Sequence, residues 1–153
     1  MKSGKLLKTV AGSVIVLGLG VSLAYASADD AIKGRQGCMK AHGALMKAAM
    51  PIMKGEAKFD AAALKTIYDA EDAACADWAK WWGPDTQKGE TVESKAKPEV
   101  WSDAAGFEAA GKAWYDAAQK LRAATDEASF KAALPGVGAG CKGCHEKYRA
   151  AEN

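Results

Sequence analysis

Apolar side chains recur along most of the chain at intervals of three and four residues, the spacing that places them on one face of an α-helix. The pattern predicts helices over residues 30–53, 61–82, 99–124 and 127–149. No run of five residues alternates between apolar and polar, so we predict no strand. The clearest stripes are Leu64, Ile67, Tyr68, Cys75 and Trp78 in the second helix and Phe107, Trp114, Ala118 and Leu121 in the third.

Capping and turn-forming residues separate these helices. Asp60 is placed to cap the second helix, and Gly83-Pro84 to end it. A loop over 84–97 leads to Pro98 and the third helix, and Asp126 starts the fourth. Two short connections and one long loop predict an all-α fold, an antiparallel four-helix bundle formed by residues 27–153 as one domain.

Two prolines fall inside predicted helices. Pro51 is expected to kink or end the first helix. Pro135, with glycines on its C-terminal side, is expected to weaken or kink the fourth helix just before Cys141.

The first 26 residues have the pattern of a cleaved signal peptide. Lys2, Lys5 and Lys8 precede an uncharged apolar run over 9–23, and cleavage sites follow at Ala26 or Ala28. A membrane anchor is the alternative, but the run is shorter than the ~20 residues a spanning helix needs. We therefore predict a periplasmic protein with no stable membrane anchor.

Charge argues against one class of partner. The full chain has a formal net charge of +2, and loss of the three leader lysines leaves the mature protein slightly acidic. It contains no basic block interleaved with aromatic residues, so we expect no nucleic-acid binding.

The motif Cys141-Lys142-Gly143-Cys144-His145 has the spacing of a c-type haem attachment site. Its two thiols can add to the haem vinyl groups, and His145 can be the proximal iron ligand. Half of a zinc site and a thioredoxin-type pair are the alternatives. Further zinc ligands are absent nearby, and the motif does not follow a predicted strand, so we predict one covalently bound haem c per chain.

The whole mature chain resembles the class II c-type cytochromes. The matching segments are 30–33, Arg35-Gln36, 54–55, 59–62 and 97–102, together with the haem motif near the C-terminus. The resemblance implies that Met39 is the distal residue and Arg35 a possible partner of a haem propionate. The stretch 39–43 is more similar to the low-spin c-556 type, in which a methionine binds the iron, than to five-coordinate cytochrome c prime.

Other iron ligands remain open at this stage. Met46, Met50 and Met53 follow Met39 on the first helix, and core packing is the default role for such methionines. His42 could give bis-histidine ligation. No catalytic constellation is visible, so we do not expect an enzyme.

Cys38 and Cys75 lie at similar distances from the first turn, so an antiparallel hairpin places them at similar height. They can form a disulfide within the chain, a disulfide between subunits or two buried thiols.

The leading hypothesis is a periplasmic one-electron carrier with a His145/Met39-ligated haem, serving redox partner proteins. The rival is a five-coordinate cytochrome c prime that binds nitric oxide or carbon monoxide, and a third is a haem sensor. A homodimer is possible because relatives in this family often dimerise through their helices.

Overall fold

The computed structural model describes residues 27–151. The predicted signal peptide, residues 1–26, lies outside the described residues.

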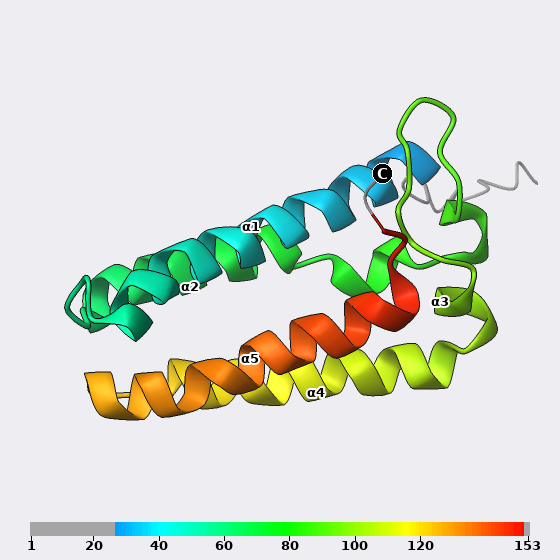
Figure 1. Ribbon diagram of the computed structural model, residues 1–153. Coiled ribbons are helices and arrows are strands. Elements are labelled where there is room, and N and C mark those ends of the chain that lie inside the picture. Colours follow the sequence, from blue (N-terminus) through cyan, green and yellow to red (C-terminus); the bar gives the residue numbers. More distant parts are fainter. Residues whose placement is uncertain (1–26, 152–153) are drawn as a thin grey trace, which may run out of the picture.

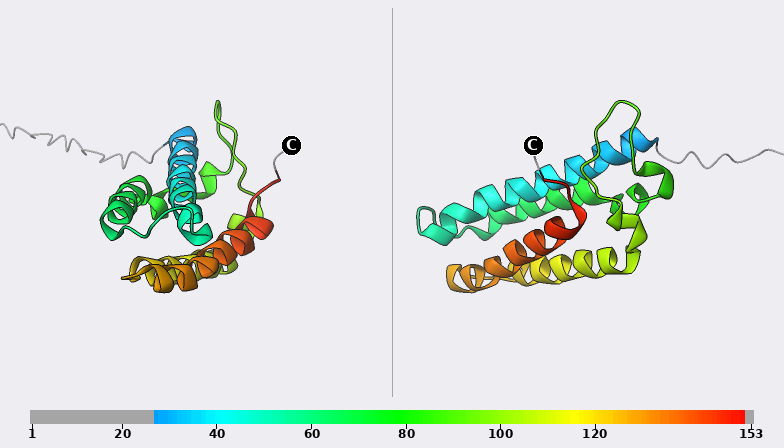
Figure 2. Two further views of the ribbon diagram at one scale, coloured as in Figure 1. Left: turned by 60° about the vertical axis from the view of Figure 1, so that its left-hand side comes forward. Right: turned by 45° about the vertical axis from the view of Figure 1, so that its right-hand side comes forward.

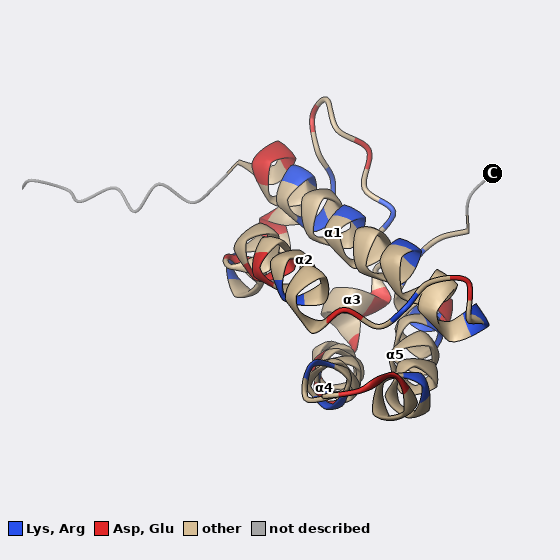
Figure 3. Ribbon diagram, turned by 90° about the vertical axis from the view of Figure 1, so that its left-hand side faces the viewer, with Lys and Arg blue, Asp and Glu red and all other residues tan. Residues whose placement is uncertain are grey.

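Four long helices form the protein (Figure 1). They are α1 (Ala28–Lys54), α2 (Ala61–Cys75), α4 (Ala104–Arg122) and α5 (Glu127–Tyr148). α1 pairs with α2, and α4 pairs with α5, so the bundle has two layers (Figure 2). Seen nearly end-on, the four helices surround a common axis (Figure 3). The predicted all-α four-helix bundle is confirmed.

Side-chain caps start all four long helices, α4 included. The side chain of Ser27 accepts a hydrogen bond from the backbone N–H of Asp30, and that of Asp60 accepts from two N–H groups at the start of α2. Asp126 forms a capping box with Ser129 at the start of α5. The capping roles expected of Asp60 and Asp126 are therefore observed.

The prediction of a second helix over residues 61–82 is wrong for its last turns. The α-helix ends at Cys75, and a 3-10 helix, η1 (Trp78–Trp81), continues the chain. Trp81 occupies the space where a Cβ on Gly34 of α1 would lie. Close approach of this ring to α1 therefore needs a glycine, and aromatic packing in η1 replaces the regular helix.

The third predicted helix, 99–124, is divided in two. A short helix, α3 (Glu99–Ser102), precedes α4, and the backbone breaks at Asp103 with φ −126° and ψ 55°. Asp103 accepts hydrogen bonds from the N–H of Gly106 and from the hydroxyl of Tyr148. The break lets one carboxylate cap α4 and also contact the end of α5.

Neither proline ends its helix. α1 continues past Pro51 to Lys54 and ends at Gly55, whose φ of 76° is left-handed. α5 runs without interruption through Pro135, which is exposed, so the carbonyl that loses its intrahelical partner can be hydrated.

The long loop contains a 3-10 helix, η2 (Pro84–Thr86). Beyond it, the carboxylate of Asp29 in α1 accepts hydrogen bonds from the N–H groups of Glu90, Thr91 and Val92. This contact attaches the loop to the first turn of α1.

The main apolar core lies toward one end of the bundle. It joins the C-terminal half of α1 to the N-terminal half of α5, with contributions from α2 and α4. Its buried members are Leu45, Ala49, Ile52, Leu64, Leu121, Phe130, Leu134 and Val137. The opposite end contains the first turns of α1, η1 and the last turns of α5 (Figure 1).

Within the described part of the chain, no helix has the length and apolar character to cross a membrane.

We expect Asp126→Ala to lower the free energy of unfolding by about 1 kcal/mol, because it removes the side-chain partner of the first free N–H groups of α5. Chemical denaturation followed by circular dichroism measures the change. Asp126→Asn is the matched control, since asparagine also caps helices. Equal losses in the two variants would contradict the cap's contribution.

Candidate haem site

Two adjoining cavities lie in the bundle. The smaller is at the end away from the main core, and the larger reaches Trp114 and Cys141, which pack against that core. Their volumes are about 440 and 590 Å³. Both are lined by the same five residues, Met39, Trp78, Phe107, Cys144 and His145, so the cavities meet along this set. Volumes of this size are typical of cofactor and ligand sites.

Cys141 and Cys144 are half-buried free thiols one turn apart on α5. Both line the larger cavity, and Cys144 also lines the smaller one. Burial raises the pKa of both thiols, so they are neutral near pH 7. One helical turn therefore presents two uncharged thiols to the same space, as covalent attachment of a porphyrin requires.

His145 and Met39 come from opposite layers of the bundle, and both line both cavities. Burial lowers the pKa of His145, which favours the neutral imidazole that binds a metal. Met39 is half-buried on α1. The structure thus brings together two residues that are more than a hundred positions apart in sequence.

Arg35 lies one turn before Met39, and its side chain is almost fully buried at 6 % exposure. Its Nη2 donates a hydrogen bond to the carbonyl of Thr86 at 2.7 Å, and its guanidinium lies 4.7 Å from the ring centre of Trp82. Its Nη1 is buried with no hydrogen-bond partner among the described residues. A buried cationic donor of this kind fits an anionic group such as a propionate.

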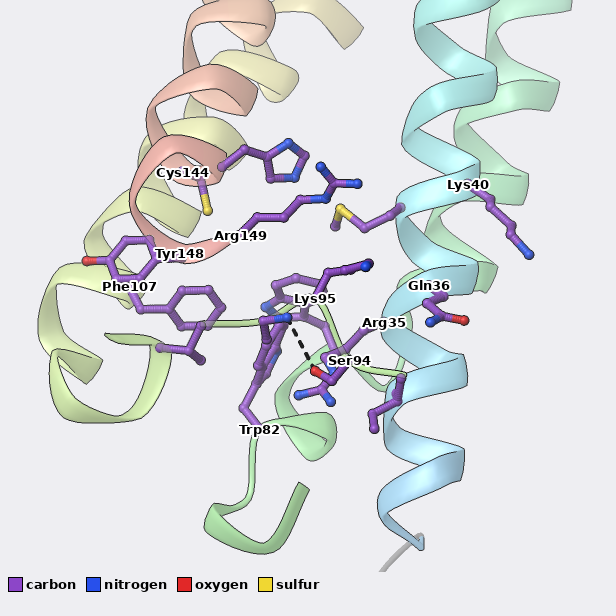
Figure 4. Close-up of a pocket in the computed structure, with 16 residues that line it drawn as sticks. Arg35, Gln36, Lys40, Trp82, Ser94, Lys95, Phe107, Cys144, Tyr148 and Arg149 are labelled. Atoms are coloured by element: carbon purple, nitrogen blue, oxygen red, sulfur yellow. Dashed lines mark hydrogen bonds between the residues drawn. The ribbon is translucent and has the colours of Figure 1, made fainter. Parts of the chain in front are cut away.

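Further polar and basic side chains line the smaller cavity (Figure 4). Arg149 extends from α5 toward α1, while Lys40 on α1 points away from the other labelled side chains. Lys95 comes from the long loop. The smaller cavity is thus the more basic of the two, and the larger holds Cys141.

Contacts with Asp103 and with the long loop hold the end of α5, directly after the haem motif. Asp103 accepts hydrogen bonds from Lys147 and Tyr148, and these hold the pKa of its carboxyl below the usual range. The N–H of Lys97 donates to the carbonyl of Tyr148, and that of Ala150 to the carbonyl of Lys95. These contacts fix the turn that carries His145.

Cys38 and Cys75 form a disulfide between α1 and α2, with an S–S distance of 2.04 Å. It lies in the wall of the larger cavity. Of the arrangements that the sequence leaves open, the structure contains the bridge within one chain.

Comparison with known proteins identifies the family. The profile of the cytochrome c' family matches residues 30–149. The chain belongs to the cytochrome c' family. This confirms the class II resemblance seen in the sequence.

Relatives of both functional types are found in this family. Cytochrome c' from Alcaligenes xylosoxydans xylosoxydans is 36% identical over 129 residues, covering 82% of this chain and 97% of that protein. Cytochrome c-556 from Agrobacterium fabrum is 34% identical over 145 residues, covering 94% and 95%. A mutant of cytochrome c prime from Alcaligenes xylosoxidans, solved as its nitric oxide complex, superposes on this structure with a TM-score of 0.70. The two chains are 36% identical, and the match covers 83% of this chain and 99% of the mutant's chain.

Haem c, bound covalently, is the cofactor of cytochrome c' proteins and hence of this chain. The residues present fit it: two free thiols one turn apart, a neutral imidazole beside them, aromatic walls and a buried guanidinium with one unpartnered nitrogen. The roles of individual residues stay predictions.

The other candidate ligands are placed differently from Met39. Met50 and Met53 are exposed, and Met46 packs against the main core. His42 lines the larger cavity, but its ring packs against Trp114 at a tilt, with the ring centres 4.2 Å apart, and lies near the disulfide. Met39 is the α1 methionine that lines the cavities.

Sequence reasoning missed two charged residues of the larger cavity, Glu71 and Arg122. Glu71 accepts a hydrogen bond from Arg122 at 2.7 Å and is only 2 % exposed. The signal was present, because position 71 falls on the apolar stripe of α2 between Tyr68 and Cys75. A charged residue on a buried stripe indicates a polar partner inside the fold.

We expect Asp103→Asn to reduce the acid sensitivity of the fold. A carboxyl whose pKa is lowered by folding stabilises the native state above its unfolded pKa, here 3.8, and loses that contribution as the pH falls through the folded value. The stability difference between wild type and variant should therefore be largest at neutral pH and shrink toward about pH 3.

Thermal unfolding across this range measures the effect. Asp116→Asn, an exposed carboxylate in α4, is the matched control. A difference between wild type and Asp103→Asn that stays constant with pH would contradict the assignment.

Proposed function

We propose that this protein is a one-electron carrier in which His145 and Met39 bind opposite faces of a haem attached to Cys141 and Cys144. The observation that supports the proposal most is that Met39 and His145, from opposite layers, line the same two cavities. A thioether beside the cavity is a ready sixth ligand for iron.

Each residue has a separate task in this proposal. The bound haem supplies an iron that alternates between ferrous and ferric states. Cys141 and Cys144 hold the porphyrin, and Arg35 pairs its unpartnered Nη1 with a propionate. The Met39 thioether would favour the ferrous state, and two protein ligands, His145 and Met39, would limit rearrangement during electron transfer.

We further propose a periplasmic location after removal of residues 1–26, with redox proteins of that compartment as partners. The basic and apolar pattern of the N-terminal segment supports export. A disulfide such as Cys38–Cys75 is also typical of an oxidising compartment.

Binding of nitric oxide or carbon monoxide is the second candidate function. One observation favours it: several solved neighbours are cytochromes c prime carrying nitric oxide. In that case Met39 would cover the distal face of the haem without binding the iron.

The electronic spectrum with and without carbon monoxide separates the two functions. For the carrier, we expect a low-spin ferrous spectrum that carbon monoxide leaves unchanged, and carbon monoxide binding in Met39→Ala, because removal of the thioether opens a coordination position. Met46→Ala is the matched control, since Met46 packs against the core. A high-spin wild-type spectrum with ready carbon monoxide binding would establish the second function instead.

Covalent attachment has its own test. We expect Cys141→Ala combined with Cys144→Ala to abolish haem that survives denaturation, since both thioether bonds are lost. Haem staining after denaturing electrophoresis and intact mass measure the loss. Haem that stays with the denatured double variant would place the attachment elsewhere.

A further inference from the structure

The Cys38–Cys75 disulfide has an unusual polar surrounding. His42 lies one turn after Cys38, and its Nε2 is 3.6 Å from the Sγ of each cysteine. Cys38 is 1 % exposed, whereas Cys75 is half-buried. One imidazole therefore contacts both sulfurs of a bridge that faces the haem cavity.

Charged groups continue from the imidazole to the surface. Oε1 of Glu71 is 3.5 Å from Nε2 of His42, and Oε2 of Glu71 is 2.7 Å from Nη2 of Arg122. Arg122 also binds the exposed Asp72 at 2.7 Å. Oε1 is buried and makes no hydrogen bond with the described residues. The buried carboxylate is thus available to the His42 ring.

A purely structural bridge would not require these groups. The core between α1, α2, α4 and α5 already joins the helices farther along α1, around Leu45 and Ile52. Burial of Glu71 and Arg122 near the sulfurs carries a desolvation cost that a staple does not explain. Acid–base groups beside a disulfide are instead what thiol–disulfide exchange uses.

We propose that Cys38–Cys75 is a second redox site of this protein, at which the disulfide exchanges two electrons with small dithiols that reach it between α2 and α4, where the exposed Asp72 and Tyr115 line the larger cavity. The site goes beyond the haem chemistry proposed above, because its electrons come from the dithiol and not from the iron.

The exchange is balanced in two displacements. His42 accepts the proton of one dithiol thiol, the resulting thiolate forms a bond to Sγ of Cys75, and the Cys38–Cys75 bond breaks. The leaving Cys38 thiolate takes the proton from His42. The second thiolate of the dithiol then displaces Cys75, whose thiolate takes that thiol's proton, so a cyclic disulfide leaves and two cysteine thiols remain.

The exposure of the two cysteines indicates which sulfur the dithiol attacks. Cys75 is half-buried and Cys38 is almost fully buried, so we assign the attack to Cys75 and make Cys38, next to Met39 in α1, the leaving group. Opening the bridge removes the covalent link between α1 and α2 at the residue before the proposed distal ligand. The redox state of the cysteines is thereby linked to the haem.

The test uses the ferrous holo-protein under inert gas with dithiothreitol as the dithiol, so that the haem does not consume the reductant. Alkylation followed by peptide mass mapping counts free thiols at Cys38 and Cys75. We expect reduction at a rate proportional to dithiothreitol concentration under native conditions. His42→Gln should slow it at least about tenfold, because the proton acceptor is lost.

Ile52→Val is the control for opening by unfolding. Ile52 belongs to the main core, fourteen residues along α1 from Cys38, and the change weakens the fold without touching the bridge. If exchange occurs in the native state, Ile52→Val leaves the reduction rate unchanged. A rate that rises about 2- to 13-fold with that variant, in step with its loss of stability, would overturn the proposal.

A wild-type bridge that dithiothreitol does not open without denaturant would overturn it as well. Failure of the haem assignment is visible separately in the same maps, because Cys141 and Cys144 would then also be alkylated.

Discussion

Burial of apolar side chains between the C-terminal half of α1 and the N-terminal half of α5 is the constraint on which the rest of this protein depends. It fixes the two helices in antiparallel register at one end of the bundle. The opposite ends of the same helices then stand across a cavity, and these ends carry Met39 and His145.

Two charged side chains in the walls of the cavities are buried. Arg35 lies over aromatic rings with one nitrogen unpartnered, and Glu71 faces His42 and Arg122. Burial lowers the pKa of His42 to about 4, so the ring is neutral near pH 7. Buried charges of this kind are expensive to retain, which is why we assign both to function.

Much of the fold follows from local rules. Periodicity located all four long helices, and the capping residues Asp60 and Asp126 marked two helix starts correctly. The errors arose where tertiary contacts override local preference. Trp81 packs against Gly34 and replaces the end of the second helix by a 3-10 turn, and Asp103 breaks the third helix to bind Tyr148. Pro51 and Pro135 are accommodated within helices, because the surrounding packing outweighs a lost hydrogen bond.

For the site, the sequence by itself determined the haem motif, because motif spacing is a local property of the chain. The resemblance to a known family, also visible in the sequence, indicated Met39 as the residue to examine. Only the tertiary structure decided that Cys38 bonds to Cys75, and that Glu71 and Arg122 meet beside His42. These contacts join residues up to about fifty positions apart, and helix packing, which no local pattern encodes, brings them together.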